Sequence, residues 1–125
     1  MTTLNFSGRF AGLVEARTKL QSIRVDRLNR LRVGMRLQLY TGLRTKNARK
    51  LSAVDPVIVE NFYVAIRPAY LTVGGTAGKP YADAFAVLDG FHDYNDMVAW
   101  FQGTYNSETF IGRCIRWSFD EALAA

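Results

Sequence analysis

Short strand-like segments dominate this chain of 125 residues, and the helix-like segments do not alternate with them in a regular way. The clearest strand is Met35–Thr41, in which Met35, Leu37 and Leu39 would face one side. The β-branched run Val57–Val59 predicts a strand that is buried on both faces. A parallel βαβ sheet needs a helix between successive strands, so this order argues against one. It favours a small mixed β-barrel of the α+β class, flanked by two short helices.

The two helices are expected near the start of the chain and in its second half. Apolar residues at helical spacing predict a helix over about Gly8–Arg17. Asp93 is a suitable N-cap for a second helix, which Gly103 would end. The other expected elements are a glycine-rich loop over Thr72–Pro80 and strands over Ser22–Val25, Asn47–Asp55, Val57–Ile66 and Phe110–Phe119.

Length and composition narrow the class of protein. A chain of 125 residues, 49% of them apolar, suffices for one domain over 1–125 with its own core. No apolar run approaches the ~20 residues that cross a bilayer. Met1–Asn5 does not resemble the start of a secretory signal, so we expect a cytoplasmic protein with no membrane partner. Cys114 and His92 are the only cysteine and histidine, so we expect no disulfide, no metal and no cofactor.

Positive charge is concentrated in one part of the chain. The net charge is +5, but the stretch from Arg17 to Lys50 alone holds 11 basic residues and one acid. Arginine outnumbers lysine 12 to 4, and the guanidinium fork matches phosphate and stacks on bases. The excess predicts a nucleic-acid-binding face, with a merely solvated surface as the alternative. The residues expected to bind nucleic acid are Arg17, Arg24, Arg27, Arg30, Arg44, Arg49 and Lys50.

Several short motifs follow one another along the chain. Lys19–Arg24 reads K-L-Q-S-I-R, Arg32–Tyr40 carries R-V-G-M-R-L-Q-L, and Asp89–Phe91 reads D-G-F before a segment that ends in Trp-Phe. In order and spacing these motifs, together with the final strand, resemble the ASCH domain family of the PUA-like β-barrel superfold. Met35 stands where that family often has Asp, and Ser22 where many members have Thr. The resemblance covers nearly the whole chain and implies a barrel whose cleft binds RNA or nucleotides.

The resemblance implies two alternative sets of catalytic residues. One branch of the family removes the acetyl group from N4-acetylcytidine with a lysine, a threonine three residues later and a downstream carboxylate. These positions match Lys19, Ser22 and Asp89, although the carboxylate of that branch is normally Glu. A serine hydroxyl needs a neighbouring base, and Lys19 serves as one only if burial or nearby cations lower its pKa.

The second set resembles that of a branch which cleaves single-stranded RNA without a metal. It consists of Tyr40 on the outer face of its strand, Lys46 beyond the Gly42 loop, and Ser118 on the polar face of the last strand. Cleavage needs a group that accepts the 2′-hydroxyl proton and cations that stabilise the phosphorane.

Binding without catalysis requires less of the residues. Basic side chains supply phosphate affinity, and exposed aromatic rings supply stacking surfaces for bases. The candidate stacking residues are Tyr40, Tyr63, Tyr70 and Tyr81. The predicted partner is therefore single-stranded RNA or a modified nucleotide. An adaptor that binds nucleic acid or an acidic protein without catalysis remains a further alternative.

Overall fold

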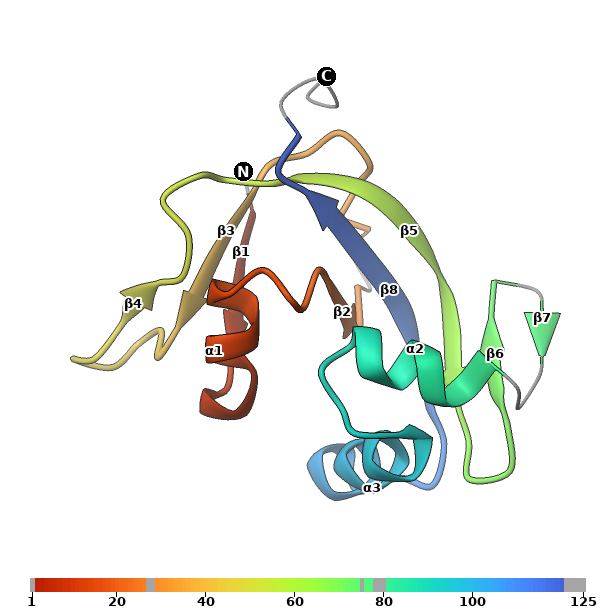
Figure 1. The fold of residues 1–125 in the computed structure, drawn as a ribbon. Helices are drawn as coiled ribbons and strands as arrows, with labels where there is room; N and C mark the ends of the chain where they lie inside the picture. The colour runs from red at the N-terminus through yellow and green to blue at the C-terminus, as the bar shows by residue number, and fades with distance from the viewer. Residues whose placement is uncertain (1, 27–28, 75, 78–80, 121–125) are drawn as a thin grey trace.

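The computed structural model describes residues 2–26, 29–74, 76–77 and 81–120 (Figure 1). Within these ranges, three short helices pack against two β-sheets, and neither sheet closes into a barrel. The α+β class predicted from the sequence is confirmed. The closed barrel is not formed by the described residues, and a third helix joins the expected two.

The first sheet has the strand order β1-β3-β4. Its strands are β1 (Thr2–Phe6), β3 (Leu37–Thr41) and β4 (Arg49–Lys50). Strand β1 runs parallel to β3, and the buried side chains of Leu4 and Leu39 lie opposite each other. The expected strand at Met35–Thr41 is confirmed from Leu37 onward. The strand expected at Asn47–Asp55 shrinks to β4, since only two residues pair with β3.

The second sheet has the order β2-β8-β5-β6-β7, and every pairing in it is antiparallel. Its strands are β2 (Gln21–Arg24), β5 (Val57–Ile66), β6 (Leu71–Val73), β7 (Thr76–Ala77) and β8 (Phe110–Ser118). Strands β5 and β8 form its long centre (Figure 1). The Ile58 N–H donates to Met35 O at 2.8 Å, and this bond ties β5 to the segment just before β3. Strand β7 and the last two residues of β6 fall within the predicted glycine-rich loop, Thr72–Pro80, which is therefore only partly a loop.

The helices are α1 (Gly8–Glu15), α2 (Ala82–Leu88) and α3 (Tyr94–Tyr105). Helix α1 ends before Arg17, whose φ of 62° is left-handed and stops the helix. Helix α3 begins after Asp93, as predicted, because the Asp93 side chain accepts a bond from Asp96 N. It continues past Gly103, and Asn106 with a φ of 51° ends it. Helix α2 was not expected, although its buried alanines and phenylalanine have helical spacing.

Helix α1 lies against the first sheet. Helices α2 and α3 lie side by side near the lower end of the second sheet, and β2 lies between α1 and α2 (Figure 1). An aromatic cluster joins α1 to α3. The Phe10 ring of α1 meets Phe91 at 5.2 Å and Trp100 of α3 at 5.4 Å, both edge to face. Arg9 of α1 pairs with Asp96 of α3. These contacts hold α1 at a fixed distance from α3.

Gly90 follows α2 at the point where three segments meet. Its φ is +97°, and a Cβ there would lie 3.1 Å from Phe10, 3.2 Å from Leu13 and 3.3 Å from Lys19. L-residues rarely adopt this backbone conformation, and the space for a side chain is already filled. The turn after α2 therefore depends on glycine.

We expect Gly90→Ala to lower the free energy of unfolding by about 2 kcal/mol, because it combines backbone strain with crowding. Gly103→Ala in α3 is the matched control, since its Cβ would meet nothing within 4 Å. It should stabilise the helix by roughly 0.5–1 kcal/mol. Urea denaturation followed by circular dichroism measures both, and equal effects would contradict this account of Gly90.

Candidate functional site

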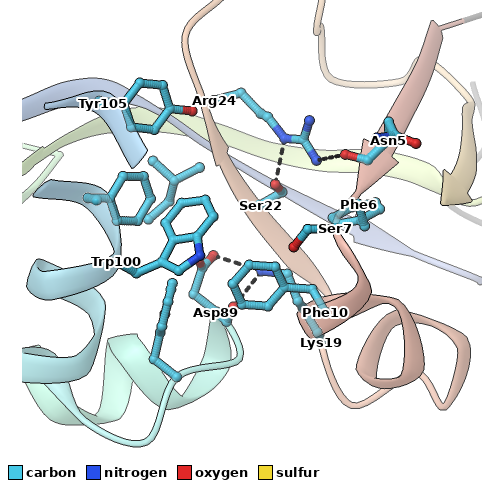
Figure 2. A pocket seen from close by; sticks show the side chains of 13 residues that line it. Asn5, Phe6, Ser7, Phe10, Lys19, Ser22, Arg24, Asp89, Trp100 and Tyr105 are labelled. Atoms are coloured by element: carbon cyan, nitrogen blue, oxygen red, sulfur yellow. Dashed lines mark hydrogen bonds and ion pairs between the residues drawn. The ribbon is translucent and has the colours of Figure 1, made fainter. Parts of the chain in front are cut away.

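A pocket with a volume of about 230 Å³ lies between α1 and α3 (Figure 2). Strand β2 contributes Ser22, Ile23 and Arg24 to its lining, and the end of β1 contributes Asn5 and Phe6. Five further aromatic and ionisable residues of the lining matter for its chemistry: Phe10, Lys19, Asp89, Trp100 and Tyr105. The pocket therefore combines flat apolar walls with buried ionisable groups.

Lys19 and Asp89 form a buried contact at one end of this pocket. Only 2% of Lys19 and 3% of Asp89 is exposed. The Lys19 ammonium lies 2.5 Å from the Asp89 backbone carbonyl and 3.3 Å from Asp89 Oδ1. Because Asp89 is the C-cap of α2, the lysine nitrogen also meets the negative end of that helix.

Burial governs the ionisation of this pair. It lowers the pKa of Lys19 and raises the pKa of Asp89, because each charged form loses its hydration. The charge of each partner opposes both changes, and Arg24 acts in the same direction as burial on Lys19. Burial thus makes Lys19 easier to deprotonate than a lysine in water, while the charge of each partner favours the ion pair. A neutral amine in a pocket can accept a proton, which an ordinary surface lysine cannot do at neutral pH.

Ser22 and Arg24 lie two residues apart on β2 and so project to the same face of the strand. Arg24 Nε donates to Ser22 Oγ at 2.7 Å, and its Nη2 donates to Asn5 O at 2.9 Å. The Arg24 guanidinium also lies over the Phe6 ring, 4.8 Å from its centroid. This cation is therefore held beside the serine oxygen, where it would stabilise negative charge that develops on that oxygen.

The structure brings together Lys19, Ser22 and Asp89, one of the two sets implied by the resemblance (Figure 2). Lys19 and Asp89 are 70 positions apart in the chain, yet they touch. Ser22 is 5% exposed and lines the same pocket.

The structure does not bring together the second set of predicted catalytic residues, which is Tyr40, Lys46 and Ser118. Tyr40 of the first sheet pairs with Lys50, while Ser118 of the second pairs with Val57. Val57 bridges to Arg36, four residues before Tyr40. The extended segment from Arg36 to Tyr40 spans about 13 Å, so Tyr40 and Ser118 are far apart. Lys46 is exposed in the loop between β3 and β4.

The predicted nucleic-acid-binding residues occupy several different environments. Arg24 lines the pocket, Arg17 lies 3.8 Å from the centroid of the Phe119 ring, and Arg27 is outside the described residues. Two of the seven are in ion pairs, Arg49 with Glu15 and Lys50 with Asp55. Arg30 and Arg44 are exposed. The local excess of positive charge is thus partly neutralised by acids from outside the basic segment.

The pocket also contains residues that sequence reasoning missed as site residues. Phe10, Trp100 and Tyr105 were not among the candidate stacking residues, yet all three line the pocket. Tyr70 and Tyr81 are exposed on other elements, at 42% and 71%. The sequence held one signal for Tyr105 as a site residue: Phe101 and Tyr105 are four residues apart, which puts both on one face of α3.

Comparisons with protein-family models, with curated proteins and with solved structures find no match to this chain. Among the described residues, no group of three His, Cys, Asp or Glu side chains is placed to hold a metal ion. No helix within the same ranges is long and apolar enough to span a membrane.

We expect Lys19→Met to lower the free energy of unfolding by about 3–5 kcal/mol, because it leaves Asp89 buried without its partner. The double variant Lys19→Met/Asp89→Asn should recover most of this loss, since neither residue is then ionisable. Chemical denaturation of the single and double variants gives the coupling energy. Arg49→Met is the control, because its pair with Glu15 is half exposed and should contribute about 0–1 kcal/mol. Additive losses at Lys19 and Asp89 would contradict the proposed coupling.

Proposed function

We propose that this chain is an ASCH-type, PUA-like domain that hydrolyses an amide on a modified nucleobase bound in the pocket. One observation carries the proposal: the lysine, serine and carboxylate matched by the family's amidohydrolase branch line a single cavity. The burial of Lys19 supplies the condition that such chemistry needs, a lysine with a lowered pKa. N4-acetylcytidine, the substrate of that branch, is the first compound to test.

In the proposed reaction Ser22 Oγ attacks the amide carbonyl carbon, and its proton passes to the neutral Lys19 amine. Arg24, which already donates to this oxygen, stabilises charge as the bond forms. Collapse of the tetrahedral intermediate breaks the carbon–nitrogen bond, and the Lys19 ammonium returns the proton to the leaving amine. Water then hydrolyses the acyl-serine to a carboxylic acid and free Ser22. Asp89 holds the lysine and balances its charge.

The dimensions and walls of the pocket favour a small planar ligand. Its volume of about 230 Å³ lies below the ~300–1,000 Å³ of sites for drug-sized molecules. The Phe10 and Trp100 rings supply apolar contact for a base. A nucleobase that carries a short acyl group therefore suits the pocket better than several stacked nucleotides.

Single-stranded RNA that carries the modified base is a second form of the same substrate. The exposed cations Arg30 and Arg44 could contact phosphates while one base enters the pocket. Strand cleavage by Tyr40, Lys46 and Ser118 has less support, because these residues lie on separate elements. An adaptor role would use the same basic residues without the buried lysine.

We expect the protein to release cytidine from N4-acetylcytidine, and Ser22→Ala to reduce kcat/KM by roughly two orders of magnitude or more. Ser22→Thr keeps a hydroxyl and should retain a substantial part of the activity. Ser52→Ala removes a hydroxyl that bonds to Val54 O in a distant turn, and it should leave the rate unchanged. Chromatography of the product measures all four proteins. No release by the unaltered protein, or full activity of Ser22→Ala, would contradict the proposal.

The rate should rise with pH, because the Lys19 amine must lose its proton before it can act as a base. Since burial lowers the pKa of Lys19 from its ordinary 10.5, the rise should level off well below pH 10.5. The pH profile of kcat/KM reports this ionisation of the free enzyme. A rate that keeps increasing through pH 10.5 would contradict the assignment of Lys19 as the base.

If RNA is the natural form of the substrate, single-stranded RNA should bind with an affinity that falls steeply with salt concentration. Arg44→Ala should weaken binding of all sequences alike and reduce the slope of log K against log salt by about one. Fluorescence anisotropy with a labelled oligonucleotide measures the slope. Binding that is independent of salt would leave the free nucleoside as the substrate.

A further inference from the structure

A series of hydrogen bonds leads from Asp89 through Gln21 of β2 to Arg116 of β8. Gln21 Nε2 donates to Asp89 Oδ1 at 3.2 Å, and Arg116 Nε donates to Gln21 Oε1 at 3.0 Å. Gln21 and Arg116 lie directly opposite each other in the antiparallel pair β2–β8, so the strand register brings them together. Gln21 is 2% exposed and does not line the pocket around Ser22. The bond to Asp89 connects the Gln21 side chain to that pocket.

The positions of the donors give this series of hydrogen bonds a direction, from Arg116 through Gln21 to Asp89. A glutamine amide can present either its oxygen or its NH₂ group, and only its surroundings decide which. Arg116 has donors alone, so it binds the amide oxygen of Gln21 and turns the NH₂ group toward Asp89. Donation to Asp89 Oδ1 favours the ionised carboxylate, the form that attracts the Lys19 ammonium.

Arg116 is itself held firmly. Its guanidinium lies over the Phe62 ring at 4.9 Å from the centroid, and its Nη1 lies 3.5 Å from Glu60 Oε1. Arg116 also lines a separate, mostly apolar cavity of about 280 Å³ beside α2. Arg116 is not among the residues that line the pocket around Ser22.

We propose that Gln21 and Arg116 are positioning residues of the site: Arg116 sets the orientation of the Gln21 amide, and Gln21 holds the Asp89 carboxylate in place beside Lys19. This inference rests on the proposed hydrolase function for its catalytic meaning. The hydrogen-bond chain itself does not depend on that function.

The other ionisable groups that face Asp89 must be considered in any titration. Lys19 and Arg24 face it from the β2 side, and both favour its ionised form. Cys114 faces it from β8, and burial raises the pKa of that thiol, so it stays neutral. Glu60 of β5 faces Arg116 rather than Asp89. Arg116 bonds to Gln21 and not to Asp89, and the variants must separate that bond from a general effect of removing a charge.

The test follows the titration of the Asp89 carboxyl carbon by NMR in the full chain, which needs no substrate. Gln21→Met and Arg116→Met should each raise the apparent pKa of Asp89 by about one pH unit, because a hydrogen bond to the carboxylate is lost. The double variant should titrate like Gln21→Met alone, since the arginine acts through the glutamine. Additive shifts, or curves that match the unaltered protein, would overturn the inference.

Two further variants keep the test independent of protein stability. Arg113→Met removes the same charge and volume from the same strand, but Arg113 bonds to Asn61 instead of Gln21, so the titration should not change. Arg116→Lys keeps a charge and a donor and should restore most of the normal titration. A shift in Arg113→Met equal to that in Arg116→Met would assign the effect to general charge and overturn the inference.

The outcome also separates this inference from the proposed function. With N4-acetylcytidine as substrate, Arg116→Met should lower kcat about tenfold and move the pH profile, while KM changes little. If the unaltered protein is inactive but the titrations shift as expected, the hydrolase proposal fails and the positioning of Asp89 stands. If the protein is active but the titrations do not shift, the hydrolase proposal stands and this inference fails.

Discussion

The buried contact between Lys19 and Asp89 is the interaction on which the arrangement of the site depends. It ties the segment before β2 to the end of α2, and it puts an ammonium group against the last carbonyl of that helix. Two ions cannot be buried this deeply unless each has a partner, because the loss of hydration costs several kcal/mol per ion. The pair therefore fixes both segments, and Gly90 next to it permits their close approach.

The same burial gives these residues their chemical character. A lysine in water is protonated and inert as a base, whereas Lys19 is inside the protein and lies against the Phe10 ring, 4.9 Å from its centroid. Arg24 adds a fixed cation beside the Ser22 hydroxyl, and aromatic rings of α1 and α3 line the same space. A buried lysine, a serine hydroxyl and a cation are thus gathered in one small cavity with aromatic walls, and the proposed acyl transfer depends on this set of groups.

Local patterns predicted part of this fold and part of this site. The strand beginning at Leu37 and the N-cap at Asp93 follow from alternation and capping chemistry, which act within a few residues. The short helix α2 and strand β1 were missed, because β1 gains its partner only through a parallel pairing with β3, 35 residues later. The motif resemblance named Lys19, Ser22 and Asp89, but it equally named Tyr40, Lys46 and Ser118.

The sequence by itself determined the α+β class, the concentration of basic residues between Arg17 and Lys50, and the residue types available for catalysis. Only the tertiary structure decided which of them meet. It separated Tyr40 from Ser118 by putting them on different sheets, and it made pocket walls of the aromatic residues Trp100 and Tyr105. The reason is physical: burial, pairing and the pKa of a side chain depend on neighbours that are distant in the chain, and these neighbours are defined only when the sheets and helices pack.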